Sequence, residues 1–328
     1  MKLFSWFLLF FSISFSAVGV ETDAIENDSA KVWLERLSKS LRQLNFNTSF
    51  VVVKNNQAEP YRWVHGVDDS NFELEILARL NGPRRDILRK GKVVSYIEPE
   101  QDVYSVASNA LNGPIPAIFS EDITVLEENY RFISVGRSRI LGRAAQLIRI
   151  VAKDNHRYGY WLWLDQQSAL LLKMAVITRQ GQLLEQIQFT HLDISEELSD
   201  ALIQLQGTDL PTPLDLSHNE QEKHFLWRVN WLPEGFKSIK ANRHRMLSNR
   251  KPVEFMLFSD GLVDVSVYVN PTQEKRRETE FAHDGATLVL NQVINGLEVS
   301  VVGKIPLSSA KKIADSIGPA SVKPNVVQ

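Results

Sequence analysis

The sequence predicts an α+β protein that is mostly antiparallel β and is divided into two domains of unequal size. Three observations support this fold class: one amphipathic helical segment near the N-terminus, a long series of short β-type runs separated by turn residues, and a second, smaller series of such runs. The runs follow one another at hairpin spacing. This spacing is typical of an antiparallel meander rather than of parallel crossover units.

The helix is expected to begin at Asp28 or Ser29, either of which can cap it. Its apolar residues recur at helical spacing, at Trp33, Leu34, Leu37, Leu41 and Leu44. Lysine, glutamate and arginine lie between them, so one face is apolar and the other is charged. We therefore expect this helix to pack against a sheet.

The first domain, residues 20–205, is expected to be a large curved sheet. The expected strands are 47–53, 61–67, 72–80, 85–89, 92–97, 103–107, 130–136, 144–152, 158–164, 170–178 and 183–192. Residues 109–119 contain Gly113, Pro114 and Pro116 and are expected to form a loop. A sheet of about nine to eleven strands curls, and when closed or half closed it can enclose an apolar cavity.

A smaller β-rich domain is expected over residues 224–318. Residues 206–223 are predicted to be the linker because Gly207, Pro211 and Pro213 lie among polar residues. The expected strands of this domain are 225–231, 253–259, 262–269, 286–294 and 297–303, with Asn295-Gly296 as a hairpin turn. A helix over 306–317, capped by Ser308 or Ser309, closes the domain, and residues 319–328 are expected to be a disordered tail.

Residues 1–19 are predicted to be a cleaved secretory signal. Met1 and Lys2 precede an apolar run from Leu3 to Phe15, and small residues at Ala17 and Gly19 suit cleavage after Gly19. A membrane-spanning helix needs about 20 apolar residues, and this run is shorter. The sequence has no cysteine, which excludes a lipid anchor on cysteine, disulfides and thiol chemistry. We therefore expect a soluble periplasmic protein after signal-peptide cleavage.

Charge is unevenly distributed along the chain. Acidic residues outnumber basic ones in residues 20–219, whereas the reverse holds for residues 220–328. Domains of opposite sign suit complementary surfaces or different partners. Nucleic acid is not an expected partner, because the protein is expected to be exported and its full sequence has a formal net charge of −2.

No catalytic constellation is evident, so the sequence predicts a binding protein rather than an enzyme, with no cofactor. The nucleophile elbow, the phosphate-binding loop, the dinucleotide glycine pattern and H-E-x-x-H are absent. The 7 histidines show no metal-ligand spacing. Ser309-Ala310-Lys311-Lys312 matches S-x-x-K, but the companion S-D-N and K-T-G patterns are missing, so Ser309 is interpreted as a helix cap.

Two groups of residues are candidates for binding. Aromatic residues on the strands of the first domain are candidates for the wall of a lipid cavity: Tyr61, Trp63, Tyr160, Trp161 and Trp163. Ordinary sheet core is the alternative interpretation. Residues 236–251 are basic and contain no acid, so their cations are candidates for binding an acidic partner or lipid phosphates: Lys237, Lys240, Arg243, Arg245, Arg250 and Lys251. A solvated loop is the alternative there.

The chain resembles the RseB/MucB family of periplasmic regulators of the sigma-E envelope-stress response. In the first domain the resemblance depends on Leu80–Arg85 with Ile87–Arg89, and on Tyr160–Asp165 with Leu170–Leu172. In the second domain it depends on Trp231–Phe236, Phe258–Leu262 with Val265–Val269, and Val301–Pro306. Each segment is modest alone, but together they span nearly the whole mature chain in the right order.

The resemblance implies a first domain like the lipoprotein carriers LolA and LolB, an unclosed β-barrel covered by helices. It also implies that the chain binds the periplasmic segment of the anti-sigma factor RseA and shields it from site-1 cleavage by a DegS-type protease. Lipopolysaccharide, acyl chains or mislocalised lipoprotein would release the segment. A periplasmic lipid or lipoprotein carrier of the LolA type is the alternative function, an envelope hydrolase is a third, and a homo-oligomer is left open.

Overall fold

The computed structural model describes residues 22–214, 225–245, 252–273 and 279–320, with only the backbone described at 22–29, 243–245 and 252. The predicted signal peptide, most of the predicted linker and the tail therefore lie outside the described residues, as do Arg250 and Lys251. Within the described ranges, no helix has the length and hydrophobicity needed to span a bilayer.

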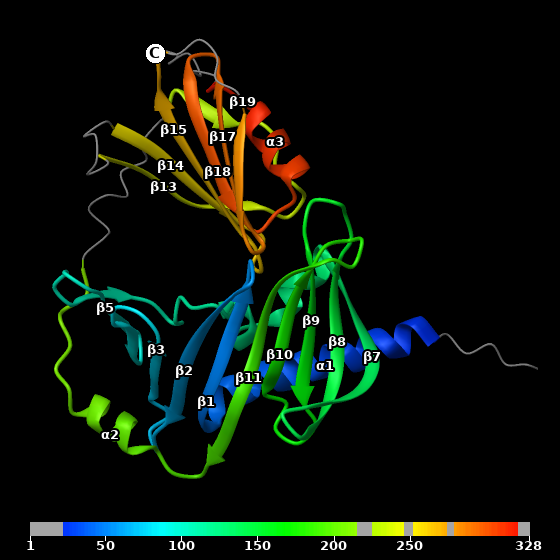
Figure 1. Ribbon diagram of the computed structural model, residues 1–328, viewed down its shortest axis with the longest axis vertical. Coiled ribbons are helices and arrows are strands. Elements are labelled where there is room, and N and C mark those ends of the chain that lie inside the picture. The colour runs from blue at the N-terminus through cyan, green and yellow to red at the C-terminus, as the bar shows by residue number, and fades with distance from the viewer. Residues whose placement is uncertain (1–21, 215–224, 246–251, 274–278, 321–328) are drawn as a thin grey trace, which may run out of the picture.

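The N-terminal domain is one antiparallel sheet wrapped around a helix (Figure 1). Helix α1 spans Thr22–Gln43, and the short α2 spans Asp200–Gln206. The strands are β1 (Asn45–Lys54), β2 (Gln57–Val67), β3 (Glu73–Arg79), β4 (Arg85–Lys90), β5 (Val93–Ile97), β6 (Tyr104–Ala107), β7 (Tyr130–Ile140), β8 (Arg143–Ala152), β9 (Gly159–Asp165), β10 (Leu171–Ile177) and β11 (Leu183–Ser195). Two 3₁₀ helices, η1 (Ala117–Ser120) and η2 (Ile123–Glu128), precede β7.

The order of these strands leaves the barrel unclosed. It runs β6-β5-β4-β3-β2-β1-β11-β10-β9-β8-β7, so β6 and β7 are the free edges. The chain forms a meander on each side, and β1 pairs with β11 where the two meanders meet. A sheet of this length must curl, and here it curls around the apolar face of α1, which buries Leu34, Leu37 and Leu41.

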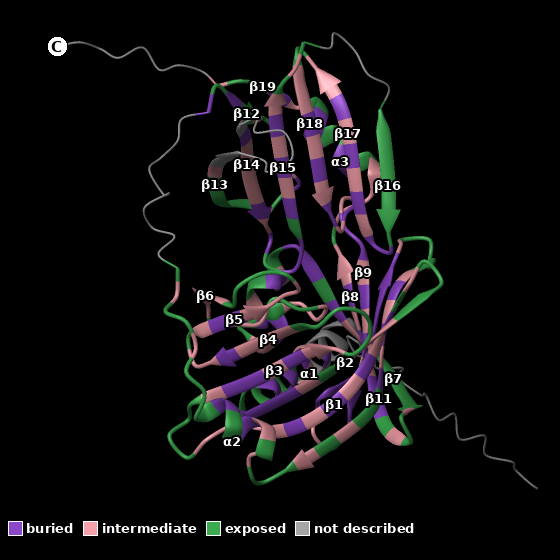
Figure 2. Cartoon of the chain, turned by 60° about the vertical axis from the view of Figure 1, so that its left-hand side comes forward, coloured by how far each residue is buried: buried purple, intermediate pink, exposed green. Residues whose placement is uncertain are grey.

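The C-terminal domain is a six-stranded antiparallel sheet in the order β13-β14-β15-β18-β17-β16, covered by α3. Its elements are β12 (Trp227–Val229), β13 (Lys237–Arg245), β14 (Pro252–Ser259), β15 (Asp264–Pro271), β16 (Glu280–Asp284), β17 (Thr287–Ile294), β18 (Leu297–Gly303), α3 (Leu307–Asp315) and β19 (Ile317–Pro319). Strands β12 and β19 form a separate two-stranded ribbon. Figure 2 shows β16 as an exposed edge.

The predicted fold class is confirmed: the protein is mostly antiparallel β, with an unclosed sheet, few helices and a separate C-terminal sheet domain. Several details were predicted wrongly, among them two helix ends and the form of the basic run. Helix α1 begins at Thr22 rather than at Asp28 or Ser29, because acidic residues at the start of a helix favour its extension there. The cap of α3 is Pro306 rather than Ser308 or Ser309. The basic run after Phe236 is the edge strand β13 rather than a loop.

Candidate functional site

A pocket of about 1210 Å³ opens in the N-terminal domain between the sheet and two loop segments. The C-terminal turn of α1 and the inner face of β2–β5 form one side of it. The other side consists of residues 109–117, and residues 208–213 cross its mouth. The pocket is larger than most sites for small ligands, which suits a long apolar ligand. Its apolar walls include Leu41, Phe50, Leu77, Leu111 and Ile115.

The pocket exists because the loop that faces the sheet cannot form a strand. Residues 109–117 hold Gly113, Pro114 and Pro116, and proline has no N–H to donate to a ladder. Gly113 lies so close to Leu77 that a Cβ there would come within 2.7 Å of the Leu77 Cδ2 atom. The loop therefore covers β2–β5 as irregular chain and leaves space that a strand or helix would have filled.

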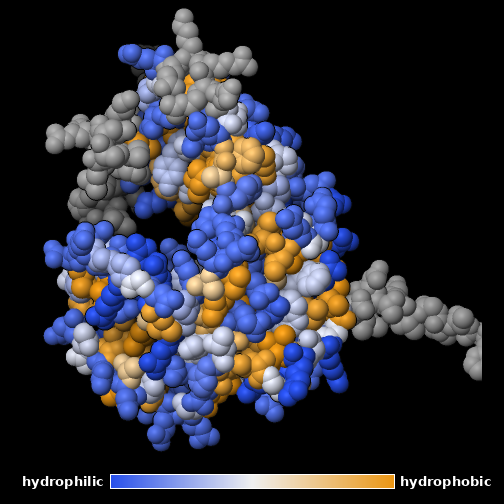
Figure 3. Space-filling model, in the orientation of Figure 1, coloured by the Kyte–Doolittle hydropathy of each residue, from blue (hydrophilic) through white to orange (hydrophobic). Residues whose placement is uncertain are grey.

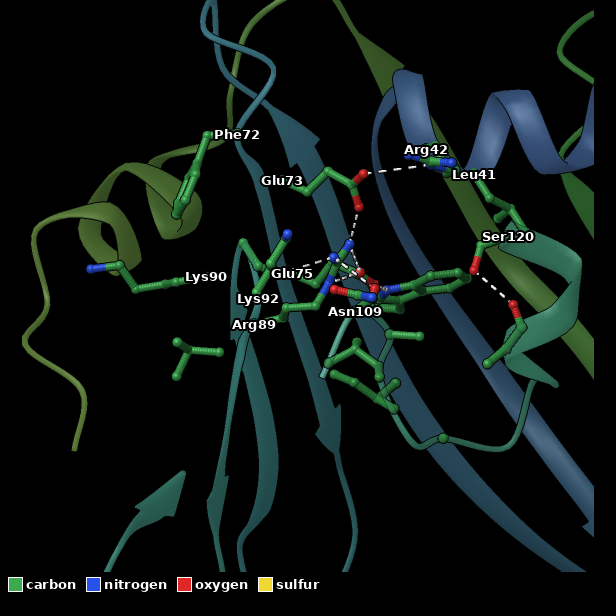
Figure 4. Close-up of a pocket in the computed structure, with 18 of the residues that line it drawn as sticks. Leu41, Arg42, Phe72, Glu73, Glu75, Arg89, Lys90, Lys92, Asn109 and Ser120 are labelled. Carbon is green, nitrogen blue, oxygen red and sulfur yellow. Dashed lines mark hydrogen bonds and ion pairs between the residues drawn. The ribbon is translucent and has the colours of Figure 1, made fainter. Parts of the chain in front are cut away.

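One wall of the pocket holds a buried ion cluster centred on Arg89 (Figure 4). The guanidinium of Arg89 donates from Nε to Glu75 at 2.6 Å and forms an ion pair with Glu73. It also donates to the carbonyl oxygen of Asn109 at 3.0 Å, which ties the covering loop to β4. Burial alone would lower the pKa of Arg89, but the two glutamates raise it above its usual value. Arg89 therefore stays charged and holds the loop.

His65 lies beside this cluster, on the face of β2 that also carries Trp63. Its Nδ1 donates to the Leu44 carbonyl oxygen at 2.8 Å, whereas its Nε2 is buried and has no hydrogen-bond partner among the described residues. Ligand atoms of His65, Glu73 and Glu75 lie within 4.8 Å of one another. Because Arg89 already pairs with both carboxylates, and Arg42 also pairs with Glu73, we interpret the group as an ion cluster of the pocket wall rather than as a metal site.

The segment that crosses the pocket mouth precedes the C-terminal domain in the chain, from which it is separated by residues 215–224, outside the described residues. The Lys90 Nζ donates to the carbonyl oxygens of Gln206 at 2.8 Å and Thr208 at 2.7 Å. The amide of Leu214 donates to the Ser105 carbonyl oxygen at 2.8 Å, where Pro213 forms a parallel bridge with β6. These contacts hold residues 206–214 against the edge of the sheet at the pocket.

A second buried cluster joins the two domains. Asp260, in the β14–β15 turn, accepts hydrogen bonds from the Tyr130 hydroxyl at 2.7 Å and from the Arg157 Nε at 2.6 Å. Its other oxygen accepts from the amides of Leu262 and Val263. Arg157 also donates to the Glu234 carbonyl oxygen. The Tyr130, Arg157 and Asp260 side chains are buried, whereas Glu234 is exposed, so the centre of the domain contact depends on a satisfied polar network. We call Tyr130, Arg157 and Asp260 the domain hub.

Two of the segments that carry the resemblance supply residues of the domain contact. Trp231–Phe236 supplies Glu234, and Phe258–Leu262 supplies Asp260, although the two segments had no evident role in the sequence. The third segment, Val301–Pro306, supplies Lys304, whose Nζ lies 2.8 Å from the buried carboxylate of Glu185 in β11. These segments therefore place the C-terminal sheet on the N-terminal one.

The aromatic residues expected at the cavity do not lie together. Trp63 lines the pocket and donates to Glu75 at 2.9 Å. Tyr61 lies on β2 outside the pocket and stacks on Phe50. Tyr160 is buried in the core, and Trp161 and Trp163 point to the other face of β9. Because side chains alternate along a strand, these two tryptophans cannot share a cavity with Tyr160.

The basic residues expected to bind a partner lie on or after β13. Lys237 and Lys240 are exposed, and Ile239 beside them is 61% exposed. Arg243 and Arg245 continue β13, but their side chains are not described. Ser309, considered for a catalytic role, is fully buried, and its Oγ lies 3.0 Å from the Nδ1 of His156 at the domain contact.

Comparisons with known proteins identify the family. Residues 29–212 match the model of the MucB/RseB N-terminal domain, and residues 221–318 match that of the MucB/RseB C-terminal domain. The sigma-E factor regulatory protein RseB of Escherichia coli is 31% identical over 95% of this chain and 97% of its own length. The sigma factor AlgU regulatory protein MucB of Pseudomonas aeruginosa is 30% identical over 90% of this chain and 93% of its own.

Solved structures agree with this result. The structure of the Pseudomonas aeruginosa MucA/MucB complex matches with a TM-score of 0.74 at 28% identity, covering 90% of this chain and 100% of that one. MucB alone matches with a TM-score of 0.60, over 89% of this chain and 98% of that one. The described arrangement is therefore more similar to MucB in the complex.

Proposed function

The chain belongs to the MucB/RseB family, and we propose that it is a periplasmic regulator that binds the exported segment of a membrane-anchored anti-sigma factor and so restrains a sigma-E response. One observation carries this proposal: the likeness to MucB in complex with MucA extends over nearly all of both chains. Both domains of the family are present. Binding, rather than catalysis, is the proposed mode of action.

The regulatory effect is proposed to come from shielding. A bound anti-sigma segment would be inaccessible to a DegS-type site-1 protease. We propose that β13 and the residues after it contribute to this binding, because Lys237 and Lys240 are exposed beside the exposed apolar Ile239. Exposed cations beside an apolar contact suit an acidic partner segment, because complementary charge steers association.

The pocket is proposed to take an acyl chain of lipopolysaccharide or of a mislocalised lipoprotein. Its apolar walls would hold the chain, and Lys90, Lys92 and Arg42 line it beside the ion cluster, where an anionic headgroup can pair. Residues 208–213 form part of the pocket wall and precede the C-terminal domain in the chain. A lipid in the pocket would therefore displace the linker that connects the two domains. This coupling provides a route by which lipid releases the partner.

A lipid or lipoprotein carrier is the second candidate, and the pocket itself favours it. In the regulator the C-terminal domain contributes to binding the anti-sigma segment, whereas a carrier would use the pocket of the N-terminal domain alone. A pull-down from an envelope extract with the full mature chain tests them: recovery of a single-span anti-sigma factor supports the regulator. Acyl-chain binding without any such partner would support the carrier.

A pocket-filling variant tests the lipid site separately. Leu111→Trp places a larger side chain in the pocket, and Leu80→Trp, in an exposed turn outside it, is the matched control. We expect Leu111→Trp to lose binding of a fluorescent fatty acid while keeping the anti-sigma partner. Equal binding by both variants would contradict the pocket assignment.

A further inference from the structure

The outer face of β8–β10 carries two tryptophans that do not line the pocket. Trp161 and Trp163 lie on the side of β9 opposite Tyr160 and Leu162, which pack toward α1. The two indole rings are 6.1 Å apart and only half-buried. Figure 1 is viewed from this side, with α1 behind the strands. Tryptophans on the uncovered face of a sheet are unusual, because a large aromatic surface is normally buried.

Strand register places a cation next to each ring. Arg149 is directly opposite Trp161 on β8, and its guanidinium lies 5.2 Å from the ring centroid. Lys173 is directly opposite Trp163 on β10, with its Nζ 4.7 Å from the ring centroid. Directly paired residues in an antiparallel sheet share a face, so these four side chains form one surface. We call Arg149, Trp161, Trp163 and Lys173 the tryptophan face.

No acid balances these cations in the two rows of the sheet that contain them. The rows, read across the paired strands, are Ile133, Arg149, Trp161, Ala175, Gln186 and Val53, and Gly136, Leu147, Trp163, Lys173, Gln188 and Val51. The Nε of Arg149 is buried without a hydrogen-bond partner among the described residues. Burial lowers the pKa of Lys173, and no carboxylate opposes that effect. Both cations are therefore available to an external anion.

The neighbouring hairpin extends the positive region. Residues 130–153 contain no aspartate or glutamate, and Arg131 on β7, which pairs with Val151 and so shares the face of Arg149, is exposed. Asp165, the nearest acid at the end of β9, is already paired with Arg143 at 2.9 Å. The surface thus combines half-buried tryptophans with basic residues that nearby acidic residues do not balance.

We propose that the tryptophan face docks the protein on an anionic lipid bilayer, with the indole rings at the headgroup level and Arg149 and Lys173 against lipid phosphates. Tryptophan is enriched at the membrane–water interface, and lysine and arginine are attracted to anionic leaflets. The sheet curls around α1, so this face is convex and offers no groove for an extended peptide. In Figure 3 hydrophobic and hydrophilic side chains are mixed over this side of the domain, as expected for an interfacial surface.

Vesicle flotation with the full mature chain tests the proposal. We expect the protein to float with vesicles that contain phosphatidylglycerol and not with pure phosphatidylcholine. Arg149→Gln with Lys173→Gln should lower the partition coefficient about twenty-five-fold, about fivefold for each cation removed. Trp161→Leu with Trp163→Leu should also weaken flotation, because leucine is not an interfacial residue. Near-UV circular dichroism of each variant verifies its folding.

Two controls separate face docking from other causes. Lys39→Gln with Lys311→Gln removes the same charge from exposed positions elsewhere and should float like the wild type. Leu111→Trp fills the pocket and should also float normally. Loss of flotation in the lysine control would show that net charge alone acts. Loss of flotation in Leu111→Trp alone would assign the lipid contact to the pocket. Either result overturns the proposal, as does a wild type that ignores anionic vesicles.

An acidic peptide is the competing occupant. Binding of soluble polyglutamate that depends on Arg149 and Lys173, without vesicle binding, would overturn the bilayer assignment. The proposal does not depend on the regulatory function: the variants of the tryptophan face should retain the anti-sigma partner in a pull-down. Failure of either inference can therefore be recognised without the other.

Discussion

The two ends of the eleven-stranded sheet are used in different ways. Strands β7–β10 bury their inner side chains in the core that also holds the apolar face of α1, and Tyr160, Leu162 and Ile148 have essentially no exposed surface. Strands β2–β5 face a loop instead, and the space between them is the pocket. Each end has one buried arginine: Arg157 joins the packed end to the C-terminal domain, and Arg89 ties the loop over the pocket. One continuous sheet thus supplies both a rigid base for the second domain and an adaptable site.

The largest expected effect is at the domain hub. Arg157→Met leaves the carboxylate of Asp260, which is fully buried, without its cation, so the free energy of unfolding should fall by about 3 to 5 kcal/mol. The measurement is equilibrium denaturation, in which loss of the hub should also separate the transitions of the two domains. Arg131→Met, on the exposed side of β7, should change stability by less than about 0.5 kcal/mol. Equal effects of the two variants would contradict the role of the hub.

Core truncation compares the two ends directly. Leu162→Ala at the packed end should cost about 3 kcal/mol, because it opens a cavity beneath α1. Leu111→Ala at the pocket should cost only about 1 kcal/mol, because its side chain already borders empty space. Thermal and denaturant unfolding of the two variants provide the comparison. If both cost the same, the pocket is filled in solution and the contrast between the two ends is wrong.

The smallest expected effect is a pH dependence at the pocket end. Burial lowers the pKa of His65, so it stays neutral in the folded chain while the unfolded chain binds a proton below about pH 6.5. Protonation of the unfolded chain costs stability as the pH falls, by about 1 kcal/mol between about pH 7 and pH 5.5. His65→Gln should remove this loss, and His191→Gln, at an exposed position, should not. Stability that rises on acidification would contradict the buried neutral state.

Much of the fold was predictable because its strands alternate. Every predicted strand of the first domain corresponds to an observed one, although the bounds differ by a few residues. Strand β13 was missed because its lysines, arginines and asparagine hide the alternation, as edge strands often do. Strand β16 and helix α2 are short and have little apolar patterning, since β16 is exposed throughout.

The sites were less predictable, because they join residues that are distant in sequence. Tyr130, Arg157 and Asp260 each lie in an unremarkable local pattern, and only folding brings them together. Strand periodicity placed Trp161 and Trp163 on one face, but it could not say which face α1 covers. The pocket arises from a loop, whose path no periodic pattern describes.

Protection of the anti-sigma segment against its protease tests the central claim most directly. The purified periplasmic segment of the cognate anti-sigma factor is incubated with a DegS-type protease, with and without this chain, and its cleavage rate is measured. The account predicts that the chain slows cleavage strongly, and that lipopolysaccharide restores cleavage with the wild type but not with Leu111→Trp. A cleavage rate that the chain leaves unchanged would contradict the account.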